Sequence, residues 1–275
     1  MAEDSVSGNM SMYYDGDKAE RCINSVQDEN AAAYRIVGAG RQSRWLVTCD
    51  HASNHVPDWV CGGDLGMCAA DMARHIAYDV GAAELAIALA EKLGCPAVLS
   101  QFSRLVIDPN RGEDDPTLLM RLYDGTIIPA NRHAGADDLA LRLNRLYRPY
   151  HAALGGMAAR QADTVIVAVH SFTPCLKGRA PRPWQVGVLH AHRDGRLSVP
   201  LIARLRAGGD LCVGDNEPYA GHLVGDAIAR HALDMGRQNT LIEVRNDLIR
   251  DRAGQQHWAA RLAPLLIGAL RDAEP

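Results

Sequence analysis

Five short, continuous runs of apolar residues constrain the fold of this chain more than any other feature. Each run is six to eight residues long, is rich in Val, Ile and Leu, and lacks the apolar–polar alternation of a strand that faces water on one side. Such runs are typical of strands that are covered on both faces. The runs are RWLVTC (44–49), CPAVLS (95–100), DTVIVAVH (163–170), WQVGVLH (184–190) and NTLIEVR (239–245). We therefore predict a sheet that lies between two layers of helices.

Helical patterns separate these runs. The clearest covers residues 69–94 and is closed by Gly94, and a second over residues 136–161 carries leucines at helical spacing. Further helices are expected over residues 198–209, 219–236 and 254–273. Strands that alternate with helices predict a three-layer α/β/α domain around a mainly parallel or mixed sheet. We expect residues 31–275 to form this single domain and residues 1–30 to be a polar N-terminal extension.

The composition limits the class of protein. The chain has 275 residues, of which 47% are hydrophobic and 23% charged, as is ordinary for a soluble globular protein. The net charge is −4 and Lys and Arg form no run of five or more, so we expect neither nucleic acid nor an anionic membrane as a partner. No segment approaches the ~18 continuous apolar residues of a membrane-spanning helix. The seven cysteines form no C-x-x-C pair, which favours reduced thiols and a cytoplasmic location. The oligomeric state stays open.

Two histidines follow predicted strands directly. Ligands of parallel sheets bind beyond the C-terminal ends of the strands. His51 lies in CDHASNHVP after the first run, and His170 ends the run VIVAVH. If both strands run the same way, the two imidazoles meet at one edge of the sheet and indicate a metal site, with Asp50 orienting His51. Taken singly, each motif is equally consistent with a capped turn or a hydrogen-bonded buried histidine.

Two further motifs carry charged residues next to apolar runs. In TLIEVRND, Glu243 and Arg245 point to the same face of a strand, where a carboxylate is costly unless it is paired. A metal-activated water would satisfy Glu243, and an internal salt bridge with Arg245 is the alternative. In SRLVIDPNRG, Arg104, Asn110 and Arg111 predict an anion pocket, with an Asp-Pro-Asn turn as the alternative.

Other residues are weaker candidates. Asp79 follows His75 by about one turn on the predicted helix 69–94, where it could cap, pair or reach a metal. Glu217 and Tyr219 lie in the turn-rich stretch DNEPYAGH, a candidate lid or substrate wall. The chain has no G-x-S-x-G, no P-loop, no G-x-G-x-x-G after a strand and no H-E-x-x-H. A Ser–His–Asp hydrolase remains open, because such triads need no local motif.

Taken together, these motifs resemble the N-formylglutamate amidohydrolase family, a distant branch of the zinc carboxypeptidase fold. The stretches that carry the resemblance are CDHASNHVP, HIAYDVGA, SRLVIDPNR, HSFTP, DNEPYAGH and IEVRNDLI, in order from Cys49 to Ile249. The resemblance implies that His51 and His170 bind zinc. Carboxypeptidases have Glu three residues after the first histidine, where this chain has Asn54. The third ligand is therefore open between Asn54, Asp79 and Glu217.

The resemblance also implies roles for the remaining residues. Glu243 is expected to act as general base and then as the acid that protonates the leaving amine, and Arg104 to stabilise the oxyanion. Asn110, Arg111, Arg245 and Tyr219 are expected to bind substrate.

The expected reaction is hydrolysis of an N-acyl amino acid, N-formyl-L-glutamate above others, to formate and L-glutamate with one zinc ion per chain. Hydrolysis of another N-acyl amino acid or of a small peptide is the alternative within enzymes. A non-catalytic protein that binds an acidic amino acid is the alternative outside them.

Overall fold

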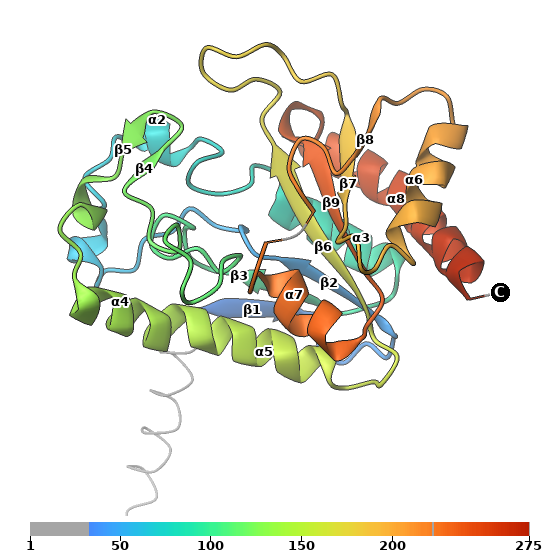
Figure 1. Ribbon diagram of the computed structural model, residues 1–275, viewed down its shortest axis with the longest axis horizontal. Helices are drawn as coiled ribbons and strands as arrows, with labels where there is room; N and C mark the ends of the chain where they lie inside the picture. The colour runs from blue at the N-terminus through green and yellow to red at the C-terminus, as the bar shows by residue number, and fades with distance from the viewer. Residues whose placement is uncertain (1–32, 222, 275) are drawn as a thin grey trace, which may run out of the picture.

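A seven-stranded sheet forms the centre of the molecule in the computed structural model, which describes residues 33–221 and 223–274 (Figure 1). The predicted extension over residues 1–30 lies outside the described residues. The strands, in spatial order, are β1 (Tyr34–Val37), β3 (Ala97–Ser100), β2 (Trp45–Cys49), β6 (Val165–Phe172), β9 (Asn239–Arg245), β7 (Val186–Leu189) and β8 (Val213–Asp215). A separate hairpin pairs β4 (Leu122–Tyr123) with β5 (Thr126–Ile127).

The four central strands β3, β2, β6 and β9 are parallel, and both edges of the sheet are reversed. β1 pairs with β3 and β7 pairs with β9 in antiparallel fashion, while β8 runs parallel to β7. All five apolar runs of the sequence are strands of this sheet, which confirms the predicted mixed α/β class. The edge strands β1 and β8 were not predicted from the sequence, since both are short and neither is apolar along its whole length.

Helices cover both faces of the sheet and create two separate cores. On one face, α3 (Ala82–Lys92), α6 (Ser198–Ala207) and α8 (Arg252–Ala273) pack against Val47, Val167 and Val244. On the other face lie α5 (Arg148–Ala158) and α7 (Ala227–His231), and α4 (Ala136–Arg142) continues into α5 through a π-helical segment (Figure 1). Leu46 and Ile166 belong to this second core. Because strand residues alternate between two apolar cores, the strands read as unbroken apolar runs.

The predicted helix over residues 69–94 is wrong in its middle. Only the single turn of α2 (Ala69–Met72) and then α3 are helical, and residues 73–81 cross between them. Gly81 precedes α3 with a positive φ of 78°, and a Cβ there would lie 2.1 Å from the carbonyl oxygen of Ile249. This close approach requires glycine and stops a continuous helix. Asp79 therefore lies in a tight turn before α3 and not on a helix.

The helix predicted over residues 219–236 is also shorter than expected. α7 covers only Ala227–His231, followed by a 3₁₀ turn over Leu233–Met235. Three further 3₁₀ turns cover Cys61–Gly63, Pro129–Asn131 and Asn246–Leu248. None of the helices within residues 33–221 and 223–274 combines the length and the apolar character that crossing a membrane requires.

Candidate active site

Two parallel strands bring His51 and His170 together at one edge of the sheet. β2 and β6 are in register with Thr48 beside Ala168, and His51 follows β2 by two residues. The two imidazole ring centres lie 5.0 Å apart in an edge-on arrangement. The geometric expectation that both histidines reach the same edge is confirmed.

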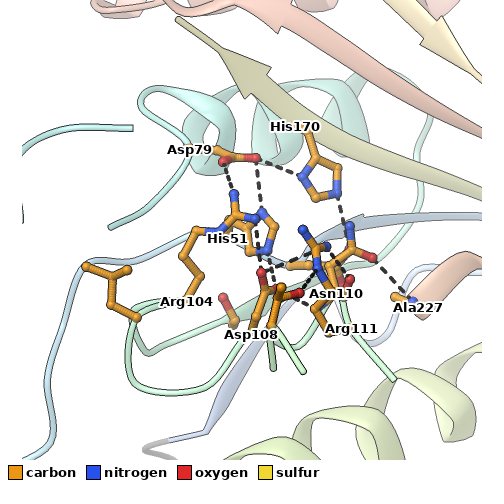
Figure 2. Close-up of polar contacts among 12 residues, drawn as sticks. His51, Asp79, Arg104, Asp108, Asn110, Arg111, His170 and Ala227 are labelled. Carbon is orange, nitrogen blue, oxygen red and sulfur yellow. Dashed lines mark hydrogen bonds and ion pairs between the residues drawn. The ribbon is translucent and has the colours of Figure 1, made fainter. Parts of the chain in front are cut away.

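Asp79 lies between the two histidines (Figure 2). Its Oδ2 is 2.7 Å from Nδ1 of His170 and 3.4 Å from Nδ1 of His51. The turn is tied in place because the backbone N–H of Asp79 donates to the carbonyl of His51, and the N–H of Ser171 donates to Oδ2. The candidate ligand atoms of these three buried residues all lie within 4.8 Å of one another. Ligands at ~2.0 Å from a tetrahedral metal ion lie about 3.3 Å apart, so the cluster has the dimensions of a metal site.

The outer nitrogen of each histidine is held by a second carboxylate. Nε2 of His51 is 2.7 Å from Oδ1 of Asp108, and Nε2 of His170 is 3.2 Å from Oδ2 of Asp50. Asp50 in turn accepts a 2.5 Å hydrogen bond from the hydroxyl of Tyr150. Metal-binding histidines usually have their second nitrogen fixed in this way. The expectation that Asp50 orients His51 is wrong, because Asp50 holds His170 and Asp108 holds His51.

The charges of the cluster favour a cation at its centre. Three aspartates are fully or almost fully buried here, and Arg104 is the buried cation that meets two of them, with Nη2 3.0 Å from Asp108 and Nη1 3.4 Å from Asp79. Burial opposes a charge on His170, but hydrogen bonds to Asp50 and Asp79 hold the pKa of His170 well above its usual value. An environment that draws a proton onto a buried imidazole is also one that stabilises a divalent cation. The donor set therefore fits zinc, which prefers His nitrogen and carboxylate oxygen.

Glu243 faces this cluster from the neighbouring strand. β6 and β9 pair with His170 beside Glu243, so both side chains leave the same face of the sheet. Glu243 is buried, and within the described part of the chain its Oε2 has no hydrogen-bond partner. Burial raises the pKa of Glu243 to about 8, against the attraction of His170. A buried carboxyl group with an open oxygen is suited to proton transfer.

A cavity of about 450 Å³ connects the cluster with Glu243 and with the predicted anion pocket. Asn110 and Arg111 line it, and Oδ1 of Asn110 accepts the N–H of Ala227 at 3.3 Å (Figure 2). Nη1 of Arg111 donates to the carbonyl of Asn110 at 2.7 Å, which fixes the guanidinium beside the amide. Tyr219 and Arg104 also line the cavity. Most of the predicted site residues thus line the same cavity.

Three of the candidate residues do not line this cavity. The amide of Asn54 donates to the carbonyl of Met72 and does not line the cavity, because the chain turns away after His51. Arg245 forms an ion pair with Asp247 at 2.8 Å, beyond the cavity. The side chain of Glu217 is outside the cavity too. Of the three residues left open as third ligand, only Asp79 is next to both histidines.

The fold and this site define an α/β protein with a buried His–Asp–His ligand set and an adjacent carboxyl group. The sequence pattern of the N-formylglutamate amidohydrolase family matches residues 43–250, so the chain belongs to this family of hydrolases.

Several solved structures are similar to this chain, including the following two. One is a gene product of Agrobacterium tumefaciens with 34% identity and a TM-score of 0.83, and the match covers 90% of this chain and 98% of that chain. The other, an N-formylglutamate amidohydrolase from Ralstonia eutropha, shares the fold with 24% identity and a TM-score of 0.64 over 88% of this chain and 97% of that one. No match was found among curated proteins.

Proposed function

We propose that this chain is a zinc-dependent amidohydrolase that cleaves an N-acyl amino acid, with N-formyl-L-glutamate as the substrate and formate and L-glutamate as the products. The observation that carries the proposal is the cavity in which the cluster of His51, Asp79 and His170 meets Glu243, whose buried Oε2 has no hydrogen-bond partner among the described residues. Family membership supports the class of reaction. The position of the ligand atoms supports one metal ion per chain.

His51, Asp79 and His170 would hold the metal, and Asp108 and Asp50 would keep the two imidazoles in position. When bound, a divalent ion supplies Lewis-acid activation of water and of the scissile carbonyl. Its positive charge also favours the ionised form of a nearby carboxyl group, which offsets the effect of burial on Glu243 at neutral pH.

Glu243 moves the proton in the proposed reaction. Its carboxylate accepts one proton from the attacking water, and the same proton passes to the departing amine when the amide C–N bond breaks. The hydroxyl group of the water therefore ends in the acid product, and the proton ends in the amine product. The open Oε2 of Glu243 leaves an oxygen free for this transfer.

Arg104 and the anion pocket position the charged groups of the substrate. Arg104 lines the cavity, and its buried Nε has no partner in the described residues, so we assign it to the oxyanion that develops during attack. Asn110 and Arg111 bind the α-carboxylate through amide and guanidinium donors. We further propose that residues 31–275 act as one catalytic domain in the cytoplasm, which the six unpaired cysteines of the described residues support.

The test combines metal analysis with a panel of substrates. Purified protein should contain about one zinc per chain and release formate from N-formyl-L-glutamate faster than it deacylates N-acetyl-L-glutamate or cleaves a glutamyl dipeptide. Removal of the metal by a chelator should abolish turnover, and zinc should restore it. A metal-free protein that binds L-glutamate without hydrolysing any of these compounds would contradict the proposal.

The Glu243→Gln variant tests the proton transfer directly. It keeps the shape of the side chain but cannot accept the proton, so kcat should fall by about 10²- to 10⁴-fold while the zinc content is unchanged. The matched control is Glu217→Gln, whose exposed side chain lies outside the cavity and which should retain full activity. Comparable activity of Glu243→Gln and wild type would remove Glu243 from the mechanism.

A further inference from the structure

Arg182 lies in the loop between β6 and β7 and is fixed against one wall of the cavity. Its Nη1 donates to the hydroxyl of Tyr219 and to the carbonyl of Thr173, both at 3.1 Å. Its guanidinium carbon is 5.0 Å from the centre of the Tyr219 ring and 5.7 Å from that of Phe172. Because Tyr219 lines the cavity, Arg182 stands directly behind the cavity wall. The planar guanidinium stacked on two rings has a defined position.

His75 places a ring nitrogen without a hydrogen-bond partner among the described residues on the lining of the same cavity. It lines the cavity, and its buried Nε2 has no hydrogen-bond partner among residues 33–221 and 223–274. The nearest carboxylate oxygen, Oδ2 of Asp124, is 3.5 Å away and is already bound by Arg74 at 2.7 Å. A buried nitrogen without a partner is costly unless a ligand satisfies it.

The positive charge of Arg182 reaches the groups that line the cavity. Burial is the main cause that lowers the pKa of His75, and the charge of Arg182 adds to it. The same charge opposes the effect of burial on the pKa of Glu243. The cavity lining near Arg182 therefore combines a positive potential with two polar groups: the hydroxyl of Tyr219, and Nε2 of His75, which donates in the tautomer that carries its proton on Nε2. Since that hydroxyl accepts from Arg182, its own proton can be donated into the cavity.

The other arginines expected to bind anions are engaged elsewhere. Arg104 meets Asp79 and Asp108, Arg245 meets Asp247, and Arg111 belongs to the Asn110 pocket. A substrate with two carboxylates needs two sets of donors. The group formed by Arg182, Tyr219 and His75 shares no residue with the Asn110 pocket, so it can serve the second carboxylate.

We propose that Arg182 is a specificity-determining residue of this chain. Tyr219 and His75 bind the second anionic group of an N-acyl amino acid, and Arg182 favours this binding through its positive charge and its hydrogen bond to Tyr219. The inference rests on the proposed function and assigns the selection of acidic over neutral side chains to this wall. Tyr219 and His75 make the contacts, and Arg182 positions and polarises them.

The experiment compares Arg182→Gln with wild type on N-formyl-L-glutamate and on the neutral isostere N-formyl-L-glutamine. We expect the variant to raise KM for N-formyl-L-glutamate by about 10- to 100-fold, as for the loss of a charge-assisted hydrogen bond, with kcat within about twofold. KM for N-formyl-L-glutamine should stay within about twofold. Arg182→Lys should recover part of the preference because it keeps the charge. The matched control is Arg179→Gln on the same loop, which does not line the cavity and should change neither KM.

A purely structural role of Arg182 would give a different pattern. Equal losses on both substrates, or a wild type that does not prefer N-formyl-L-glutamate, would overturn the inference while the hydrolase proposal stands. If the wild type hydrolyses neither compound, the proposed function fails, and calorimetric titration with L-glutamate and L-glutamine then tests the wall alone. A preference of wild type for L-glutamate that Arg182→Gln lacks supports the inference, and equal binding or no binding overturns it.

Discussion

Residues 33–221 and 223–274 contain two buried histidine pairs, at nearly the same separation but in different surroundings. The ring centres of His51 and His170 are 5.0 Å apart, and those of His151 and His231 are 5.1 Å apart. The first pair meets edge-on, whereas the second is stacked, with Nδ1 of His151 2.9 Å from Nε2 of His231. All four side chains are buried. Burial and proximity therefore do not distinguish the two pairs.

The neighbours of the two pairs decide their chemistry. A carboxylate oxygen lies within 3.4 Å of each of the four ring nitrogens of the first pair, and hydrogen bonds to Asp50 and Asp79 hold the pKa of His170 well above its usual value. In the second pair, His151 packs against Tyr147 and Tyr150, and burial lowers the pKa of His151 to about 3 and that of His231 to about 4. The first environment recruits positive charge, and the second excludes it. The surrounding carboxylates, and not the pairing of the histidines, thus distinguish the first pair as the candidate metal site.

The largest expected difference between the pairs is in metal binding. His170→Ala removes a nitrogen that we propose as a metal ligand and takes one partner away from each of Asp79 and Asp50, so zinc content should fall below about 0.1 per chain and kcat/KM by at least about 10³-fold. His231→Ala should keep both the zinc and the activity, because no ligand is lost. Metal analysis and formate release measure both variants. Loss of zinc in both variants, or in neither, would contradict the assignment of metal binding to the first histidine pair and not to the second.

A smaller effect is expected from the carboxylates that hold the outer nitrogens. Asp108→Asn replaces the acceptor of His51 Nε2 by a neutral amide, so affinity for zinc should fall by about 10- to 100-fold. Competition with a chelator of known affinity measures this change. Asp114→Asn, on the exposed surface near the same loop, is the control and should bind zinc like wild type. Unchanged affinity of Asp108→Asn would mean that Asp108 does not support the zinc site through His51.

The central architecture could be predicted from the sequence because each central strand is apolar on both faces. NTLIEVR was predicted as a strand over residues 239–245, and β9 has those bounds. The strands predicted over residues 44–49 and 163–170 have bounds within two residues of those of β2 and β6. The helix over residues 69–94 failed because the close approach of Gly81 to Ile249 is a tertiary contact, which no helical periodicity reveals.

The candidate site was predictable where a polar residue interrupts or follows an apolar run, and not where it comes from a distant turn. His51, His170 and Glu243 stood out against apolar runs. Asp79 had no decisive signal, since its place between the histidines depends on the turn before α3. Asn54 was one of three open candidates for the third ligand because of its spacing alone, and its side chain does not line the cavity. Arg182 lies in a loop with no periodic pattern, so only its contact with Tyr219 singles it out.

The last prediction concerns stability and uses the second histidine pair. In the unfolded chain both histidines have pKa values near ~6.5, whereas in the folded state they fall to about 3 for His151 and about 4 for His231. Below pH ~6.5 the unfolded chain therefore binds more protons than the folded chain. The contribution of the pair to stability is fully present above that pH, is lost progressively as the pH falls, and levels off below both folded values. Each unit by which the pKa is lowered corresponds to about 1.4 kcal/mol.

Urea unfolding of wild type and of His151→Phe/His231→Leu between pH ~4.5 and ~7.5 measures this contribution. The double variant cannot titrate at these positions, so its unfolding free energy should fall less steeply below pH ~6.5 than that of wild type. Both proteins are compared without metal, and the carboxylate cluster around His51 and His170 contributes equally to both curves. The difference between the curves therefore isolates the second pair. Parallel curves would show that His151 and His231 are protonated in the folded protein, and the contrast between the two pairs would then no longer hold.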